Sequence, residues 1–372
     1  MKKLSDLFKI YKGKKAEATE VDTGFRYIQI GDLRNDDVLK FAVKSPSNVL
    51  CDTNDILIAW DGANAGTIGY NLSGVLGSTL AKLTPKVDGI NIDYAGRFLQ
   101  SKFKYLRENC TGATIPHISR HSLESLQVPL PPLKTQKKIA AILDEADSYK
   151  QMTKTLLDKY DALTQSLFLD MFGDPVTNPK GWGKTPMSDL MKIVRGGSPR
   201  PIDKFLGGTY PWIKIGDATK GNDIYLESTK QHIIEEGLKK TRLLPKGSLI
   251  FANCGVSLGF ARILTFEGCI HDGWLAFSEI DKKELNEIFL LKALNSITRY
   301  FRETAPDGTQ PNLNISIMSK FKIILPPIEL QNKFEKSLFQ IEAQKAQAEQ
   351  SLLQAENLFN SLLQEAYKGE LV

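Results

Sequence analysis

The sequence is poor in the residues that build disulfide frameworks and metal sites. It holds four cysteines, none in a Cys-x-x-Cys pair, and its four histidines complete no zinc-ligand spacing. Reduced thiols and no bound metal are therefore expected.

Long apolar runs are also absent. No stretch approaches the roughly 18 apolar residues of a membrane-spanning helix, and the basic N-terminus, MKKLSDLFKIYKGKK, lacks the apolar segment of a signal peptide. This predicts a soluble, cytoplasmic protein. Its 372 residues, 42% hydrophobic and 24% charged, suffice for two cores. The net charge of +5 favours approach to a polyanion without requiring one.

Catalytic motifs are missing as well. Gly181–Thr185, GWGKT, resembles the end of a phosphate-binding loop, but Asn178 stands where that loop needs glycine, and Pro179 removes a backbone amide. There is no dinucleotide fingerprint or H-E-x-x-H motif. A non-catalytic chain without a cofactor of its own is predicted.

The chain does contain a tandem duplication. Ser5–Leu7 recurs as Ser188–Leu190, and Lys12-Gly13 recurs as Arg195-Gly196, at an offset of 183. From Leu80 the offset is 195, and it stays constant to Leu167. Insertions are thus confined to the first part of each repeat. A part whose length is fixed is typical of a helical spacer, because each inserted residue rotates a helix face by about 100°.

Two segments fit such a spacer. Leu133–Phe172 and Ile328–Tyr367 contain neither proline nor glycine, and each predicts one long helix. Their apolar positions alternate by threes and fours, the spacing of a coiled coil. The predicted seam comprises Ile139, Leu143, Ala146, Lys150, Thr153, Leu157, Tyr160, Thr164, Leu167 and Met171, then Phe334, Leu338, Ile341, Lys345, Ala348, Leu352, Ala355, Phe359, Leu362 and Ala366. Lys150 and Lys345 have two interpretations. They either help to select how the two helices pair, or they lie at the edge of the seam with their ammonium groups reaching solvent.

These signals predict an α+β fold: two globular domains joined by two long antiparallel coiled-coil helices, related by a pseudo-two-fold axis. Paired prolines at 131–132 and 326–327 open the helices, and Gly173 and Gly369 close them. The expected domains are 1–132 and 173–327, with helical spacers at 133–172 and 328–372. Each globular part should carry one helix, near 91–109 and 284–304.

At this point the residues resemble a known family. PLPPLKTQKKIAAILDEAD, ILPPIELQNKFEKSL, WIKIGD and GTQPNLN together look like the DNA specificity subunits of Type I restriction-modification systems. The resemblance covers the whole chain and rests on the order of domain and spacer. It implies recognition of a bipartite, asymmetric site in double-stranded DNA. It also implies two modification (methyltransferase) subunits and restriction (translocase and nuclease) subunits as partners, which would use S-adenosylmethionine, ATP and magnesium.

Candidate DNA contacts lie early in each repeat and in its variable loops. The phosphate candidates are Lys9, Lys12, Lys14, Lys15, Lys192, Arg195, Arg200 and Lys204, although ordinary solvated side chains are the alternative. The base-reading candidates are Arg34, Asn35, Asn64, Lys214, Asn222 and Asn253. His117 and Asn312 occupy equivalent loops, and Trp60 and Trp212 are interpreted mainly as core residues.

Three other functions stay open on sequence alone. One is a DNA-modifying or ATP-using enzyme, although no nucleotide or methyl-donor site is recognisable. Another is a coiled-coil scaffold that presents two protein-binding domains without DNA. The third is the recognition subunit of a related enzyme that fuses restriction and methylation in its partner.

Overall fold

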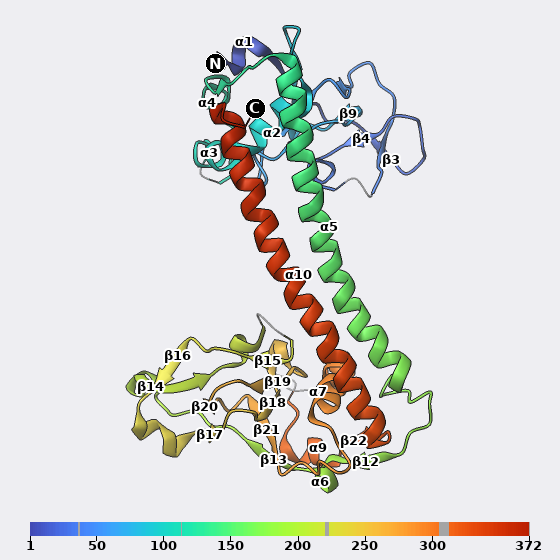
Figure 1. The fold of residues 1–372 in the computed structure, drawn as a ribbon, viewed down its shortest axis with the longest axis vertical. Coiled ribbons are helices and arrows are strands. Elements are labelled where there is room, and N and C mark those ends of the chain that lie inside the picture. Colours follow the sequence, from blue (N-terminus) through green and yellow to red (C-terminus); the bar gives the residue numbers. More distant parts are fainter. Residues whose placement is uncertain (36–37, 113, 220–222, 305–311, 372) are drawn as a thin grey trace. The chain divides into compact units, whose positions relative to one another are not determined.

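The computed structural model describes residues 1–35, 38–112, 114–219, 223–304 and 312–371 (Figure 1). By internal contacts the chain forms two compact units. Unit 1 comprises Met1–Thr155 and Glu349–Val372, and unit 2 comprises Leu156–Ala348. No helix of the described residues is long and apolar enough to cross a membrane.

Unit 1 is built on an antiparallel four-stranded sheet of order β2-β10-β7-β8, accompanied by a three-stranded sheet of order β4-β9-β6. The first sheet contains β2 (Phe8–Lys12), β10 (Leu80–Pro85), β7 (Ile56–Ala59) and β8 (Ile68–Gly69), and the second β4 (Tyr27–Ile28), β9 (Gly74–Leu76) and β6 (Leu50–Cys51). Every residue of β7 is buried, which explains its unbroken apolar sequence ILIA.

Two short ladders and four short helices complete the globular part of unit 1. The ladders pair β1 (Lys2–Lys3) with β11 (Gln127–Val128) and β3 (Ala18–Thr19) with β5 (Phe41–Ala42), and the helices are α1 (Leu4–Leu7), α2 (Ile92–Ser101), α3 (Phe103–Glu108) and α4 (Arg120–Glu124).

Unit 2 repeats this plan and adds a strand to each sheet. Its first sheet has the order β13-β21-β18-β19-β15, with β13 (Lys192–Arg195), β21 (Trp274–Ser278), β18 (Leu249–Ala252), β19 (Ala261–Leu264) and β15 (Tyr225–Leu226). The second has the order β16-β14-β20-β17, with β16 (Gln231–Ile233), β14 (Leu206–Ile213), β20 (Gly268–Ile270) and β17 (Arg242–Leu244). The matching strand orders confirm the tandem repeat.

Further elements of unit 2 also have counterparts in unit 1. They are the ladder of β12 (Lys184–Pro186) with β22 (Lys322–Ile324), and the helices α6 (Met187–Leu190), α7 (Glu287–Ser296), α8 (Thr298–Thr304) and α9 (Ile315–Lys320).

The two predicted long helices are present. The first, α5, spans Leu133–Phe172 as predicted, and the second, α10, spans Ile328–Lys368, one residue longer than predicted. Gly173 and Gly369 follow them with positive φ angles of 75° and 84°, which is the usual glycine termination of a helix.

The two helices run antiparallel within each unit. In unit 1, Lys154 of α5 forms an ion pair with Glu356 of α10, whereas the earlier residue Lys150 lies over the ring of the later residue Phe359. In unit 2, Asp161 pairs with Lys345, and the later ring of Phe168 packs 5.5 Å from that of the earlier Phe334. Every residue of the predicted seam is buried or half-buried.

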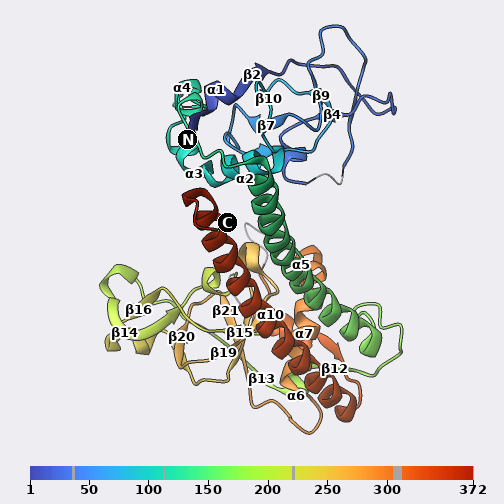
Figure 2. The ribbon, with the colours of Figure 1, turned by 45° about the horizontal axis from the view of Figure 1, so that its top comes forward.

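The ends of the long helices join the globular cores (Figure 2). In unit 1, Tyr367 in the last turns of α10 packs against Tyr94 and Phe98 of α2, with ring centroids 5.4 and 5.1 Å apart. In unit 2, the ring centroid of Phe172 at the end of α5 lies 4.7 Å from that of Phe289 in α7. Each core therefore contains helix residues that the sequence assigns to a separate spacer.

The prediction of one helix near 91–109 and one near 284–304 was wrong in detail. Each segment forms two helices, with breaks at Lys102 and Ile297. Just before each break a serine hydroxyl donates a hydrogen bond to the carbonyl three residues earlier, from Ser101 to Phe98 and from Ser296 to Ala293. Such bonds compete with the backbone ladder and favour a helix end.

Candidate nucleic-acid interface

A carboxylate at the end of a central strand organises the candidate interface of unit 1. Asp61 follows β7, and its two oxygens lie 2.9 Å from Nζ of Lys12 and 2.6 Å from Nδ1 of His117. The side chain of Asp61 is 18% exposed, while those of Lys12 and His117 are 53% and 47% exposed. Two cationic or hydrogen-bonding groups are thus held at the surface by one shielded anion.

Opposing effects set the charge of this carboxylate. Burial raises the pKa of Asp61, but the hydrogen bonds from His117 and Lys12 and the charge of Lys12 outweigh that effect. The pKa of Asp61 is therefore lowered, which keeps the carboxylate ionised.

A second polar group lies on the loop that Asp61 begins. Asn64 in this loop accepts a hydrogen bond of 2.6 Å from the exposed guanidinium of Arg34. Asn35, Lys14 and Lys15 are exposed. The structure thus joins Lys12 to His117 and Arg34 to Asn64, but records no contact of Lys14 or Lys15 with either group.

Unit 2 places a comparable group at the end of β13. The side chain of Asp272 accepts a hydrogen bond of 2.8 Å from Ser198, and its Oδ2 lies 3.5 Å from the guanidinium of Arg200. Nε of Arg195 donates to the Asp272 carbonyl at 2.8 Å, and Nδ1 of His271 lies 3.0 Å from Oδ1. Arg195 and Arg200, both predicted phosphate contacts, are therefore brought together.

The surroundings of His271 disfavour its protonated, positively charged form. Burial lowers the pKa of His271, Asp272 raises it, and Lys214, Arg200 and Arg195 lower it, so that the net shift is downward. Burial would raise the pKa of Asp272, but the Ser198 hydrogen bond and the nearby cations hold it below its usual value. A neutral imidazole beside an ionised carboxylate follows at neutral pH.

Lys9 of unit 1 and the other basic candidates of unit 2 lie apart from these groups or touch their edge. Lys214 is exposed, and its ammonium lies 5.3 Å from the ring centroid of Trp212. That ring is 2% exposed, as expected for a core residue, whereas Trp60 is half-buried. Lys9, Lys192 and Lys204 are exposed, without a recorded contact to these groups, and Asn222 lies outside the described residues.

The structure corrects the prediction for Asn253. Its side chain is fully buried, and Nδ2 donates a 3.2 Å hydrogen bond to Oδ1 of Asn312. A direct base contact needs an exposed side chain, which Asn253 does not present in this structure. His117 and Asn312 do hold equivalent places, since each forms an isolated bridge with the residue two positions beyond the central strand, Asp61 or Cys254.

The repeated Lys-Gly and Arg-Gly dipeptides have a steric reason. A Cβ atom on Gly13 would clash with the carbonyl oxygen of Gly77, and one on Gly196 would clash with that of His271. The strand that carries each basic residue therefore passes directly against the backbone of a neighbouring loop, and only glycine allows that approach.

Sequence reasoning missed a pair of buried glutamines at the start of the long helices. Oε1 of Gln136 accepts the backbone N–H of Asn91 at 2.9 Å, and its Nε2 donates to the carbonyls of Gly89 and Pro131. Gln331 makes the same three bonds at positions 195 residues later, to Asn286, Glu284 and Pro326. The available signal was the repeated string Pro-Pro-x-x-x-Gln.

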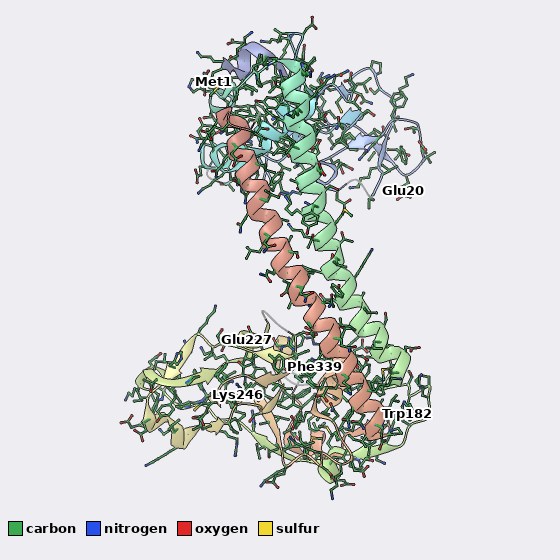
Figure 3. The ribbon with its side chains drawn as sticks, viewed as in Figure 1. Met1, Glu20, Trp182, Glu227, Lys246 and Phe339 are labelled. Carbon is green, nitrogen blue, oxygen red and sulfur yellow. The ribbon has the colours of Figure 1, made fainter. Side chains whose placement is uncertain are left out.

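The segment that resembles a phosphate-binding loop has a structural role. Trp182, labelled in Figure 3, donates from Nε1 to the carbonyl of Phe172 at 2.9 Å. Asn178 accepts the Trp182 backbone N–H at 3.0 Å. The segment thus caps the end of α5. Within the described residues, no three His, Cys, Asp or Glu side chains are grouped to hold a metal ion.

Comparison with known proteins decides the family. The model of the Type I restriction modification DNA specificity domain matches residues 1–159 and 179–356. The chain belongs to this family of Type I DNA specificity proteins. The two matched regions agree with the tandem repeat. Family membership makes DNA sequence recognition within a Type I restriction-modification system, rather than catalysis, the role of the chain.

Relatives of this family match along most of the chain. The MjaVIII specificity subunit of Methanocaldococcus jannaschii is 25% identical over 91% of this chain and 85% of its own length. The EcoBI specificity subunit of Escherichia coli is 21% identical over 96% of this chain and 82% of its own length.

Solved structures share the fold. The Type I S subunit from M. genitalium has a TM-score of 0.58 at 17% identity, with 98% of this chain and 95% of that chain covered. A chain from a study of complex assembly and conformational transition of the Type I system has a TM-score of 0.65 at 16% identity, with 100% and 97% covered.

Proposed function

We propose that the chain reads a bipartite, asymmetric site in double-stranded DNA, one half with each recognition domain (1–132 and 173–327). The observation that carries this proposal is that the two units share one scaffold but have different side chains at equivalent positions of the candidate interface. Lys12, Asp61 and His117 in unit 1 correspond to Arg195, Cys254 and Asn312 in unit 2. Equivalent frames can dock alike on a duplex, while different side chains read different bases.

The chemistry of the groups divides between positioning and reading. The exposed cations, Lys12, Lys14, Lys15, Arg195, Arg200 and Lys204, suit phosphate contacts, which fix orientation without sequence information. Arg34, Asn35, Asn64, His117, Lys214 and Asn312 offer donors or acceptors that suit base edges. Asp61 and Asp272 are acceptors of the kind that bind the amino group of cytosine.

The long helices suit a spacer between the half-sites. Helices of 40 and 41 residues extend about 60 Å at 1.5 Å per residue. This length falls between one and two turns of DNA at about 34–36 Å per turn. In this proposal the length of α5 and α10 sets the unspecified gap.

The outer helix faces suit partner subunits. On α5, Tyr149 and Met152 of unit 1 are 54% and 68% exposed, and Leu163 of unit 2 is 48% exposed. Apolar side chains exposed on a helix are a common feature of protein interfaces. We propose that these faces dock two methyltransferase subunits, joined in the full complex by restriction subunits. S-adenosylmethionine, ATP and magnesium would act in those partners, in the cytoplasm.

Methylome sequencing tests the proposal. A methylation-deficient host would carry this chain with its neighbouring modification subunit, and a second culture the modification subunit alone. The expected result is a new split motif, two defined halves around a fixed gap, only when this chain is present. An active complex that produces no new motif would overturn the DNA-reading role and favour a protein scaffold.

A further inference from the structure

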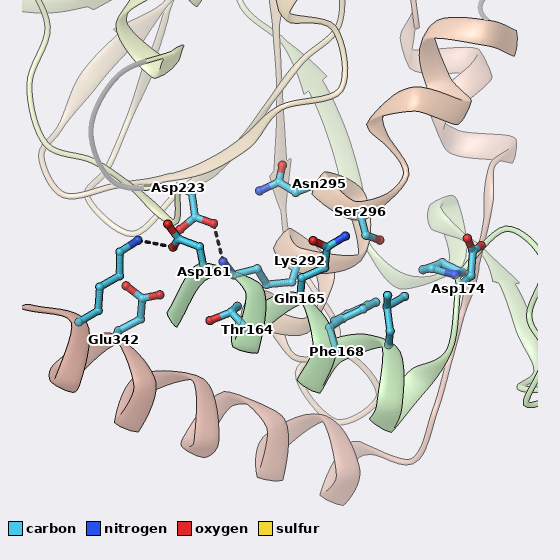
Figure 4. Close-up of a pocket in the computed structure, with 13 residues that line it drawn as sticks. Asp161, Thr164, Gln165, Phe168, Asp174, Asp223, Lys292, Asn295, Ser296 and Glu342 are labelled. Carbon is cyan, nitrogen blue, oxygen red and sulfur yellow. Dashed lines mark hydrogen bonds and ion pairs between the residues drawn. The ribbon is translucent and has the colours of Figure 1, made fainter. Parts of the chain in front are cut away.

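Unit 2 contains a pocket of about 590 Å³ between α5, α7 and α10 (Figure 4). Its volume lies in the roughly 300–1,000 Å³ range of small-molecule sites. Phe168, Leu169 and Pro175 give it an apolar side, and the rest of its described lining is polar, with four carboxylates, Asp161, Asp174, Asp223 and Glu342, against two ammonium groups, Lys292 and Lys345. None of the DNA-contact candidates that the structure describes lines it.

The internal repeat shows what fills the equivalent place in unit 1. At the offset of 195, Thr164 in the pocket corresponds to Phe359 of α10. The ring of Phe359 sits under two cations, with Lys150 Nζ 4.2 Å and the Arg97 guanidinium 5.8 Å from its centroid. Unit 1 therefore seats an aromatic ring where unit 2 has a small threonine beside the pocket.

The corresponding cations in unit 2 are still in place. Lys345 corresponds to Lys150, and Lys292 to Arg97, and both line the pocket. A ring seated on Thr164 would meet ammonium groups as Phe359 does, in cation–π contacts of the same kind.

Within the part of unit 2 that the structure describes, a carboxylate of the pocket also lacks the cationic partners of its unit 1 counterpart. In unit 1, Asp147 is held by Arg97 at 2.8 Å and by Lys150 at 2.6 Å. Its counterpart Glu342 has no such partner. The ammonium group of Lys292 instead forms an ion pair with Asp223 at 2.7 Å, and that of Lys345 forms one with Asp161. Among the described residues, Glu342 makes no hydrogen bond or ion pair. Burial, then the charge of Asp223, raises the pKa of Glu342.

We propose that the unit 2 pocket binds a ligand that combines an aromatic ring with a positively charged amine. The ring takes the place that Phe359 fills in unit 1, against Thr164 and Phe168. The amine pairs with Glu342 and offsets the excess of carboxylates. An anionic aromatic compound would meet that excess and bind poorly. This inference does not depend on the DNA-reading role.

The probe is phenethylamine, titrated by ligand-observed NMR into the full chain without its modification subunit. Phenylacetate carries the ring with the opposite charge, and butylamine carries the amine without the ring. We expect binding of phenethylamine at least tenfold tighter than that of either control. Equal binding of all three compounds, or no binding of phenethylamine, would overturn the proposal.

Variants locate the site. Thr164→Phe fills the pocket with the side chain that unit 1 uses, and should abolish binding of phenethylamine. Thr164→Ser keeps the space and should retain binding. Glu342→Gln should weaken phenethylamine severalfold but leave binding of neutral benzyl alcohol unchanged. Circular dichroism melting identifies a variant that fails to fold. Undiminished phenethylamine binding in a folded Thr164→Phe variant would show that the ligand binds elsewhere and would overturn its assignment to the unit 2 pocket.

The same variants separate two sources of the ligand. If a segment of the modification subunit supplies the ring and the charge, Thr164→Phe weakens assembly with that subunit, and phenethylamine competes with it. If the source is a free aromatic amine, assembly is unchanged while amine binding is lost. Loss of amine binding with an intact methylation motif also leaves the DNA-reading role standing.

Discussion

At the scale of single residues, the buried glutamines at the helix starts are the clearest structural device. Gln331 is fully buried and satisfies one N–H and two carbonyl groups between α10 and the start of α7. Its replacement by an apolar residue leaves those groups without partners in a dry site. Each such loss costs about 1–3 kcal/mol.

We therefore predict that Gln331→Leu lowers the free energy of unfolding by about 3 kcal/mol. Urea unfolding followed by circular dichroism measures this difference. Gln340→Leu, at an exposed position of the same helix, is the matched control and should change stability by less than about 0.5 kcal/mol. Equal effects of the two substitutions would show that the buried hydrogen bonds contribute little.

A second residue-scale prediction concerns pH. Because burial raises the pKa of Glu342 above its ordinary value near 4.5, the ionised form disfavours the folded state. Glu342→Gln should stabilise the protein at pH 7, by under about 1 kcal/mol for a half-buried group. Its advantage should shrink as the pH falls through the raised pKa, since wild-type Glu342 then becomes neutral. Melting temperatures of both proteins between pH 7 and pH 4.5 test this, and a constant difference would contradict it.

Sequence reasoning predicted equivalence between residues better than it predicted their exposure. His117 and Asn312 were paired by offset alone, and the structure places them in equivalent bridges. Asn253 was expected at the surface, yet it is fully buried and donates a hydrogen bond to Asn312. Asp272 went unnoticed because its cationic partners come from a separate segment and meet it only in the folded chain. Burial and partners depend on loop packing, which no local spacing records.

At the scale of elements, the long helices were the most predictable part. Forty residues without proline or glycine, with a continuous seam, leave no competing structure. The breaks at Lys102 and Ile297 were missed because serine back-bonding leaves only a weak signal in the sequence.

The helices also give an element-scale prediction. Duplicating Asp147–Thr153 in α5 and Glu349–Ala355 in α10 adds one heptad to each, which keeps the seam in phase to within about 20°. The added length is about 10 Å. At about 3.4 Å per base pair, the gap in the methylated motif should lengthen by about three base pairs, with both halves unchanged.

Methylome sequencing reads this gap directly. A variant with the heptad added to α5 alone is the control, because its seam no longer matches and methylation should fall. Efficient methylation with an unchanged gap in the doubly extended variant would show that the helices do not set the spacing.

At the scale of the whole molecule, the division of the chain differs from its linear order. The sequence suggests that a domain ends where its spacer begins, at 132. By contacts, unit 1 takes in the start of α5 and residues 349–372, where Tyr367 donates a hydrogen bond to the Tyr94 carbonyl at 3.1 Å. Such packing between segments 273 residues apart leaves no signal in a local pattern. The constant offset of 195 shows that the repeats match, but not which segments pack together.

The repeat makes its strongest prediction about independence of the two half-sites. Asp61 and Asp272 each organise the candidate interface of one unit, and they share no partner. Asn at either position keeps the shape and removes the charge. Asp61→Asn should therefore relax one half of the methylated motif, and Asp272→Asn only the other, each at a cost of about 1–3 kcal/mol in discrimination. The gap should stay the same in both, because neither residue lies on α5 or α10.

Methylome sequencing of the two variants and of Asp158→Asn, an exposed position on α5, measures the outcome. The Asp158 variant should keep the wild-type motif. If a single substitution altered both halves together, the two units could not be reading DNA separately. Changes confined to one half per variant would instead mean that duplication of one scaffold yields an asymmetric site, because each copy carries its own carboxylate near the equivalent basic residue, Lys12 or Arg195.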